Sequence, residues 1–303
     1  MVEHFAFAWD GRTVRIGLER QGSGPTLLLL PALSSISTRG EMRPLQERLS
    51  SAYATVAVDW PGFGDEPRPA VAWQPETYRA FLRHVLAQVV VAPFATVAAG
   101  HGAGYLLAQA AEAPGSAGRL GLIAPTWRGP LPTMMNGQRA AFRWLARAVD
   151  VPLLGQAFYR LNVSPPVIRR MVSGHVYDDP TWLTDARFSE KRAVTSAPGA
   201  RHSSFRFVAG ELDPMSSRSA FLQAAERVSD PILMIYGANT PRRSKAEMEG
   251  LTGLKNIRTV QLSVGKLAVH EEFPDLVASA ILEFLVGDRG QEAEGSEGTV
   301  AER

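Results

Sequence analysis

The sequence predicts an α/β protein built on a mostly parallel, doubly wound sheet. Short runs of aliphatic and β-branched residues alternate with segments of helical spacing, and this alternation is typical of strands joined by crossover helices. At 303 residues, with 45% hydrophobic and 20% charged residues, the chain has the composition of a folded globular protein. Its length suits one core with an insertion.

Each element follows from a local pattern. Residues 5–9 and 13–19 predict an opening hairpin, because Asp10-Gly11 supplies the positive φ angles of a tight turn. Later strands are predicted at apolar runs, and helices where apolar residues recur every three or four positions. The strands are expected at 26–30, 54–58, 95–99, 120–124, 232–236 and 259–262, and the helices at 42–49, 75–89, 103–111, 218–228, 245–251 and 274–285.

The alternation of strands and helices stops between residues 126 and 210. This segment has the pattern of several helices and is rich in Trp, Arg, Tyr and Pro. We therefore expect a core formed by residues 1–125 and 211–287, with a helical lid at 126–210 inserted after the sixth strand. The Gly, Glu and Ser content of residues 288–303 predicts a disordered acidic tail.

Composition excludes several classes of protein. The absence of cysteine removes disulfides, thiolate nucleophiles and Cys-ligated metals, and the six histidines have no metal-ligand spacing. We expect neither a metal nor a cofactor. A net charge of +2 without a basic cluster gives no footprint for nucleic acid. The longest apolar runs fall short of the ~18 residues that a membrane helix needs, and no secretory signal is recognisable at the start, so a cytoplasmic location is expected.

Glycines follow the predicted strand at 95–99. Gly100-His101-Gly102-Ala103-Gly104 has the frame of the G-x-S-x-G turn that carries a nucleophile between a strand and a helix. Three further stretches accompany it, at residues 27–32 (LLLLPA), 58–64 (VDWPGFG) and 271–276 (EEFPDL). Over roughly residues 5 to 286 the chain thus resembles the α/β-hydrolase superfamily. It is most similar to the lid-bearing branch of haloalkane dehalogenases, epoxide hydrolases and carbon–carbon hydrolases.

That resemblance implies a nucleophile, an acid and a histidine at three positions, and each of them is vacant here. The nucleophile position falls on Gly102, which has no side chain. The acid position falls on Thr240, beside Asn239, and neither residue is charged. Alignment on Glu271 and Pro274 places the base position on Leu267, so that His270 is only an alternative base. Classical serine-hydrolase activity is therefore not expected.

The resemblance also implies a binding site that survives without the triad. The backbone N–H groups of Leu33 and Ala103 are the expected oxyanion donors. The other candidate binding residues follow predicted strand ends, where ligands of open α/β sheets collect: Ser34, Ser35, His101, Trp127, Arg128 and Asn239. For His101 a structural role is the favoured interpretation, and for Arg128 a structural and a ligand-binding role are equally open.

The leading functional hypothesis is an α/β-hydrolase-fold protein with a degenerate triad. In this hypothesis a small, mostly apolar molecule, with or without an anionic end, binds between core and lid. The protein then performs non-covalent chemistry or none. One alternative is a divergent hydrolase in which His270 activates water for attack on an ester or carbon–carbon bond. The other is a non-catalytic protein-interaction module. The oligomeric state is left open by the sequence.

Overall fold

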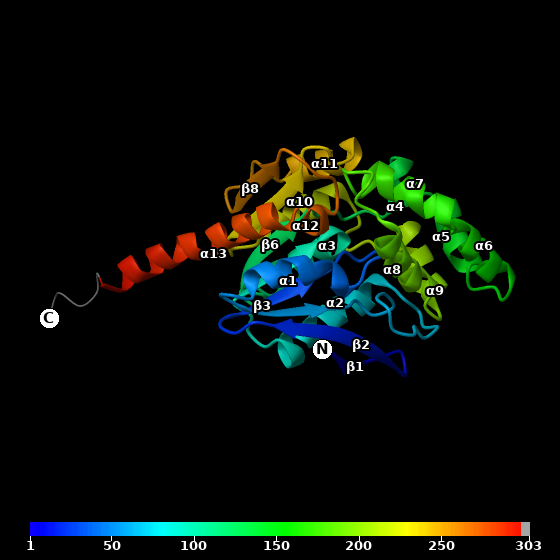
Figure 1. The fold of residues 1–303 in the computed structure, drawn as a ribbon, viewed down its shortest axis with the longest axis horizontal. Coiled ribbons are helices and arrows are strands. Elements are labelled where there is room, and N and C mark those ends of the chain that lie inside the picture. The colour runs from blue at the N-terminus through cyan, green and yellow to red at the C-terminus, as the bar shows by residue number, and fades with distance from the viewer. Residues whose placement is uncertain (298–303) are drawn as a thin grey trace.

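The computed structural model describes residues 1–297 of the chain, with side chains described for residues 1–287. It contains an eight-stranded sheet in the order β1-β2-β4-β3-β5-β6-β7-β8 (Figure 1). The first two strands pair antiparallel and the others are parallel to one another. The strands are β1 (Val2–Trp9), β2 (Arg12–Gln21), β3 (Thr26–Leu30), β4 (Ala54–Val58), β5 (Ala95–Ala99), β6 (Arg119–Ile123), β7 (Ile232–Gly237) and β8 (Ile257–Leu262).

Alternate residues of the central strands point to opposite faces of the sheet, and each face is buried by helices. Leu27 and Leu29 of β3 pack in one apolar cluster with residues of the last helix, whereas Leu28 and Leu30 pack in a second cluster with Phe81. Both faces of β3 are thus apolar, which explains its uninterrupted leucine run. The first face is covered by α1 (Arg43–Leu49), α12 (Val269–Glu272) and α13 (Pro274–Glu297), and the second by α2 (Pro75–His84), α3 (Gly100–Glu112) and α10 (Arg218–Arg227).

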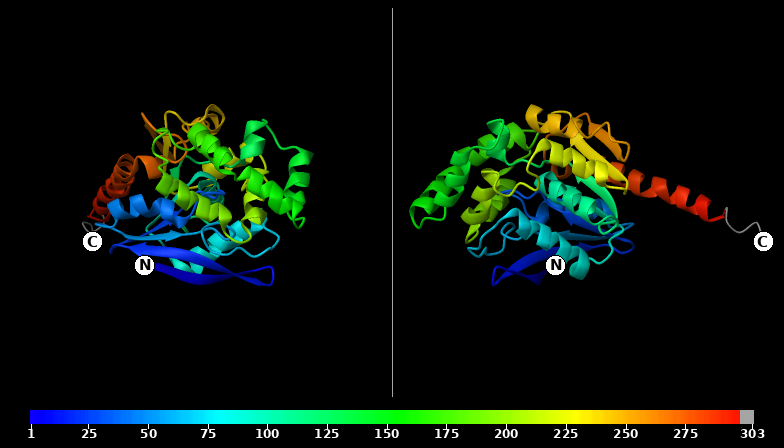
Figure 2. Two further views of the ribbon diagram at one scale, coloured as in Figure 1. Left: turned by 45° about the vertical axis from the view of Figure 1, so that its right-hand side comes forward. Right: turned by 180° about the vertical axis from the view of Figure 1, so that it is seen from behind.

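A group of helices lies between β6 and β7 in the sequence and to one side of the sheet, at the right of Figure 1 and, seen from behind, at the left of the right-hand view in Figure 2. The helices are α4 (Pro130–Met134), α5 (Ala140–Ala148), α6 (Leu154–Asn162), α7 (Pro165–His175), α8 (Asp185–Ser196) and α9 (Ala200–Val208), and α11 (Arg242–Glu249) follows β7.

The predicted α/β-hydrolase architecture is confirmed, and most element boundaries agree within a few residues. The hairpin turns at Asp10 and Gly11, both with positive φ. The helix expected at 42–49 is preceded by a 3-10 turn at Arg39–Met42, and the helix expected at 75–89 ends in a wider turn at Val85–Val89. The last helix continues to Glu297, so part of the expected tail is helical, and residues 298–303 lie outside the described part. None of the described helices has the length and hydropathy needed to cross a membrane.

Candidate functional site

Strand β5 runs directly into helix α3 through a sharp backbone bend. The residue in the left-handed region is Gly100, at φ +52°. Gly102 lies in the first turn of α3 and is not among the glycines with a positive φ. The bend thus falls two residues before the position that the sequence suggested. Since both residues are glycines, the bend carries no reactive side chain in either register.

The end of β3 closes over this bend. A methyl group added to Gly100 would lie 3.2 Å from the Ala32 side chain, and one added to Gly102 would lie 2.7 Å from the Pro31 carbonyl oxygen. The same Pro31 oxygen accepts a hydrogen bond from the Trp60 indole, at 2.8 Å. Little room is therefore left for a side chain at Gly102.

We expect Gly102→Ala to lower the free energy of unfolding by about 1 to 3 kcal/mol, the usual cost of overpacking. The added methyl group would press on the Pro31 oxygen and on the Trp60 ring, 3.1 Å away. Urea unfolding measures the effect. Gly174→Ala in helix α7 is the matched control, because nothing lies within 4 Å of that position. Alanine is the better helix former there, so the control should be neutral or stabilising. Equal losses in both variants would contradict the packing described for the bend.

The first turn of α3 also settles which backbone N–H groups are free. In a helix that begins at Gly100, the N–H of Ala103 is the first to bond within the helix, to the carbonyl of Ala99. By this rule the N–H groups of Gly100, His101 and Gly102 have no acceptor within the helix. His101 directly follows the bend, whereas Ala103, the donor expected from the sequence, lies three residues beyond it. Leu33 is fully buried.

His101 is held as a neutral structural residue. Its ring is buried, its Nε2 lies 3.0 Å from the carbonyl oxygen of Leu212, and the Tyr105 hydroxyl donates to the same oxygen. Burial lowers the pKa of His101 to about 4, against the weaker opposing effect of the Leu212 carbonyl. The ring is thus uncharged near pH 7, and its Nε2 is the protonated nitrogen in this hydrogen bond.

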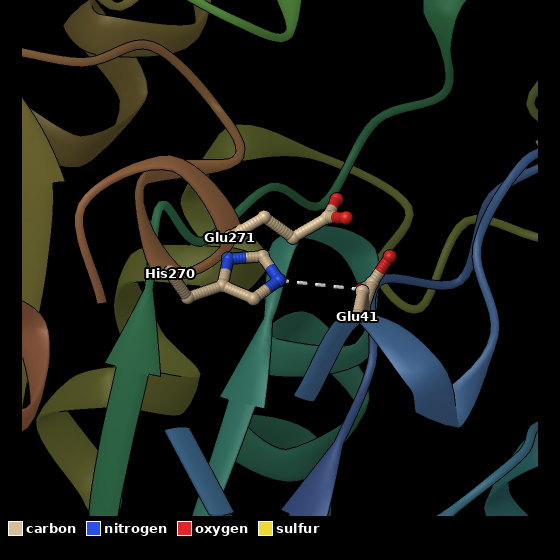
Figure 3. Close-up of side chains that lie close together, drawn as sticks. All are labelled: Glu41, His270 and Glu271. Carbon is tan, nitrogen blue, oxygen red and sulfur yellow. Dashed lines mark ion pairs between the residues drawn. The ribbon is translucent and has the colours of Figure 1, made fainter. Parts of the chain in front are cut away.

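His270 faces a carboxylate and not a hydroxyl group. The ring is 1% exposed, and its Nε2 lies 3.4 Å from an oxygen of Glu41 (Figure 3). That carboxylate also accepts the N–H of Ala32. Burial acts most strongly on Glu41 and would raise its pKa, but His270, Lys191 and the Ala32 N–H together hold that pKa below its usual range.

Glu271 completes this buried cluster from the other side. Its carboxylate accepts hydrogen bonds from the Lys191 ammonium, at 2.9 Å, and from the Tyr177 hydroxyl, at 2.8 Å. One oxygen or nitrogen from each of Glu41, His270 and Glu271 lies within 4.8 Å of the others, a spacing that a cation could bridge. Lys191 supplies one positive charge beside the two carboxylates, paired directly with Glu271.

The two remaining triad positions carry no charge. The Thr240 hydroxyl lies 3.5 Å from the carbonyl oxygen of Lys266, and the Asn239 amide donates to Asp178 at 2.7 Å. Leu267 packs at the margin of the apolar core.

The serines after β3 bond to their own loop. The Ser34 and Ser37 hydroxyls lie 2.8 Å apart, and the Ile36 N–H donates weakly to Ser34. No hydrogen bond from Ser34 or Ser35 to a histidine is found within residues 1–287. These contacts are typical of a serine-rich turn rather than of an activated nucleophile.

Trp127 and Arg128 line the larger of two described cavities, about 970 Å³ in volume. The Arg128 guanidinium stacks on the Trp127 ring, with 5.2 Å between its carbon and the ring centre, and lies 3.4 Å from Glu247. The Trp127 Nε1 and Arg128 Nε atoms are buried without a partner among the described residues. The wall is formed by helices α2, α3, α10 and α11 and by residues 127–138 and 210–218.

Asp213 is a site residue that the sequence analysis missed. It lines this cavity, accepts the N–H of Gly129 at 2.8 Å and lies 3.4 Å from the His101 ring. Burial raises the pKa of Asp213 to about 8, although the Gly129 N–H and the charge of Arg128 oppose the rise. An Asp-Pro pair in a connecting segment has the pattern of an ordinary turn, so only burial distinguishes this carboxyl group.

The chain was compared with known families and structures. Residues 27–280 match the model described as the alpha/beta hydrolase family, and no curated protein matches. Similar solved structures include the epoxide hydrolase CorEH (19% identity, 95% of this chain and 99% of that one covered, TM-score 0.71). A thermophilic esterase from Thermogutta terrifontis is another (16% identity, 93% and 98% covered, TM-score 0.70). An ancestral haloalkane dehalogenase is a third (17% identity, 95% and 99% covered, TM-score 0.70). Likenesses at this identity concern the fold alone.

Proposed function

This chain belongs to the alpha/beta hydrolase family, and from that premise we propose that it binds a small molecule between the core and the inserted helices without forming a covalent intermediate. The observation that carries the proposal is the side-chain-free bend at Gly100. Covalent catalysis in this fold requires a nucleophile at that bend, and a hydrogen atom cannot attack a substrate.

In the part of the chain whose side chains are described, neither the nearby serines nor the histidines are placed as a substitute nucleophile or base. Ser34 is engaged with Ser37, and His101 is neutral and bonded to Leu212. The alternative in which His270 activates water requires that ring to reach a substrate or a water molecule. The ring is 1% exposed and faces Glu41 instead, which favours a role in holding the loop after β3 in place.

In this proposal the binding site is the larger cavity, which lies between helices of the core and residues 127–138 of the inserted segment and is not lined by Gly100 or Gly102. Trp127, Met215 and three prolines offer apolar surface, and the Arg128 guanidinium stacked on Trp127 offers a positive charge. Asp213 adds a protonated carboxyl group near pH 7, because its pKa is raised to about 8. These groups suit a small, partly apolar ligand with an acceptor such as a carboxylate, and they permit proton transfer without a covalent step.

The proposal predicts that a small molecule co-purifies with the protein and depends on Arg128. Native mass spectrometry of the purified protein should show a bound species that is lost in Arg128→Ala, because the variant removes the stacked guanidinium and its donors. Arg143→Ala on helix α5 is the control, since that residue is exposed and lines neither described cavity. A ligand retained equally in both variants would place the site elsewhere.

A further inference from the structure

A second cavity, about 420 Å³ in volume, lies among the inserted helices over the turn between α8 and α9. Helices α6 and α7 form its other side. Its lining contains three arginines, Arg160, Arg192 and Arg201, and no aspartate or glutamate. Ser164, Ser196 and Gln156 are among the other residues of the lining.

The three arginines have no acidic partner. Within residues 1–287, Arg160 and Arg192 form no side-chain ion pair or hydrogen bond, and Arg201 bonds only to the neutral Gln156, at 3.0 Å. The Arg201 Nε atom is buried without a partner. Three arginines without an acidic partner therefore line one cavity.

A fourth arginine lies directly beneath the turn. Arg68 is 5% exposed, and its backbone N–H donates to the carbonyl of Pro198 at 2.9 Å. Its Nη2 donates to the carbonyls of Gly64 and Val194, whereas its Nε and Nη1 atoms are buried without a partner. Arginine stays charged when buried, and the carboxylates of Asp59 and Asp65 lie close enough to stabilise this charge. Arg68 thus places a partly compensated positive charge beneath the turn.

We propose that this cavity is an anion site that binds a small molecule bearing phosphate or carboxylate groups, with Arg160, Arg192 and Arg201 as its ligands. Guanidinium groups pair with both kinds of oxyanion in bidentate geometry, and Ser164 and Ser196 add hydroxyl donors at the same wall. The site is separate from the larger cavity and does not depend on the absence of a nucleophile.

The larger cavity and the cluster beside His270 differ from this cavity because both contain carboxylates. Glu76, Glu112, Glu211, Asp213 and Glu247 accompany the four arginines of the larger cavity, and Lys191 pairs with Glu271 beside His270. Of the two described cavities, only the smaller one has several arginines and no carboxylate in its lining.

Isothermal titration calorimetry with pyrophosphate and, separately, with succinate tests the proposal. The expected result is binding that weakens at least tenfold in the Arg160→Gln/Arg192→Gln double variant, because each charge-assisted contact contributes about 1.5 kcal/mol or more. The double variant Arg143→Gln/Arg147→Gln removes the same charge from exposed positions of α5 and should bind as the wild type does. Thermal melts should show that both double variants remain folded, since all four side chains are exposed.

Each outcome has a defined meaning. Binding of pyrophosphate alone supports the proposal with a phosphorylated ligand, binding of succinate alone supports it with a carboxylate ligand, and binding of both supports a general oxyanion site. Absence of binding by both probes at low salt overturns the proposal. Equal weakening in the two double variants also overturns it, because the effect would then reflect net charge rather than this cavity.

Discussion

Replacement of Arg39 by methionine is expected to destabilise the protein by about 3 to 5 kcal/mol, the cost of leaving buried charges without their partner. Arg39 is 4% exposed and pairs with Asp59, which is 2% exposed. It also contacts Glu19 at 3.2 Å and Asp65 at 2.7 Å. Methionine preserves the apolar stem but removes the cation that pairs with Asp59. Burial raises the pKa of Asp59 to about 7 even beside Arg39, so urea unfolding at pH 8 or above, where this carboxyl group is ionised, should show a much lower midpoint.

Arg43→Met provides the control for this loss. Arg43 shares Glu19 with Arg39, at 3.0 Å, but its side chain is 56% exposed. An exposed ion pair contributes about 0 to 1 kcal/mol, so this variant should unfold close to the wild-type midpoint. Similar midpoints for the two variants would contradict the view that the Arg39 and Asp59 pair fixes the segment after β4. That segment includes Trp60, whose ring lies 3.1 Å from the position a Gly102 methyl group would occupy.

Replacement of Asp213 by asparagine is expected to stabilise the protein increasingly as the pH rises from 5 to 8. Burial raises the pKa of Asp213 to about 8 in the folded state, whereas the unfolded chain releases this proton near pH 4. Release of the Asp213 proton therefore lowers the free energy of unfolding of the wild type by up to about 1.4 kcal/mol for each pH unit in this interval. The decrease ends once the pH exceeds the pKa of Asp213 in the folded state. Asparagine does not ionise, so the variant does not show this decrease in the free energy of unfolding.

Denaturant unfolding of wild type and variant at pH 5, 7 and 9 measures this difference. Asp178→Asn is the control. Burial tends to raise the pKa of Asp178, but hydrogen bonds from Asn239 and the Gly265 N–H hold that pKa below its usual value. Asp178 is therefore ionised throughout the interval, and its variant should differ from wild type by a constant amount. A difference that is independent of pH for Asp213→Asn would contradict a buried, protonated carboxyl group in the larger cavity.

The sequence predicted the sheet well because its strands are marked by local patterns. The leucine run of β3 is apolar on both faces, and the turn at Asp10-Gly11 needs positive φ angles that these residues adopt readily. Both features can be recognised without knowledge of distant residues.

The candidate site depends on contacts that no local pattern reveals. Gly100 and Gly102 are the same residue type, and only the positive φ angle of Gly100 in the structure identifies it as the bend. Glu41 and His270 are far apart in the chain and meet through the end of β3. Asp213 and the arginines of the smaller cavity became candidates through burial and missing partners, which are properties of the fold.

Intact-mass analysis after incubation with a fluorophosphonate probe tests the central claim most directly. The probe forms a stable adduct with activated serine nucleophiles, and a chain with glycine at its strand-to-helix bend has none to offer there. The account predicts that the mass of the folded protein is unchanged after prolonged incubation. A stoichiometric adduct that is lost on denaturation before labelling would show an activated hydroxyl group in the folded chain and contradict it.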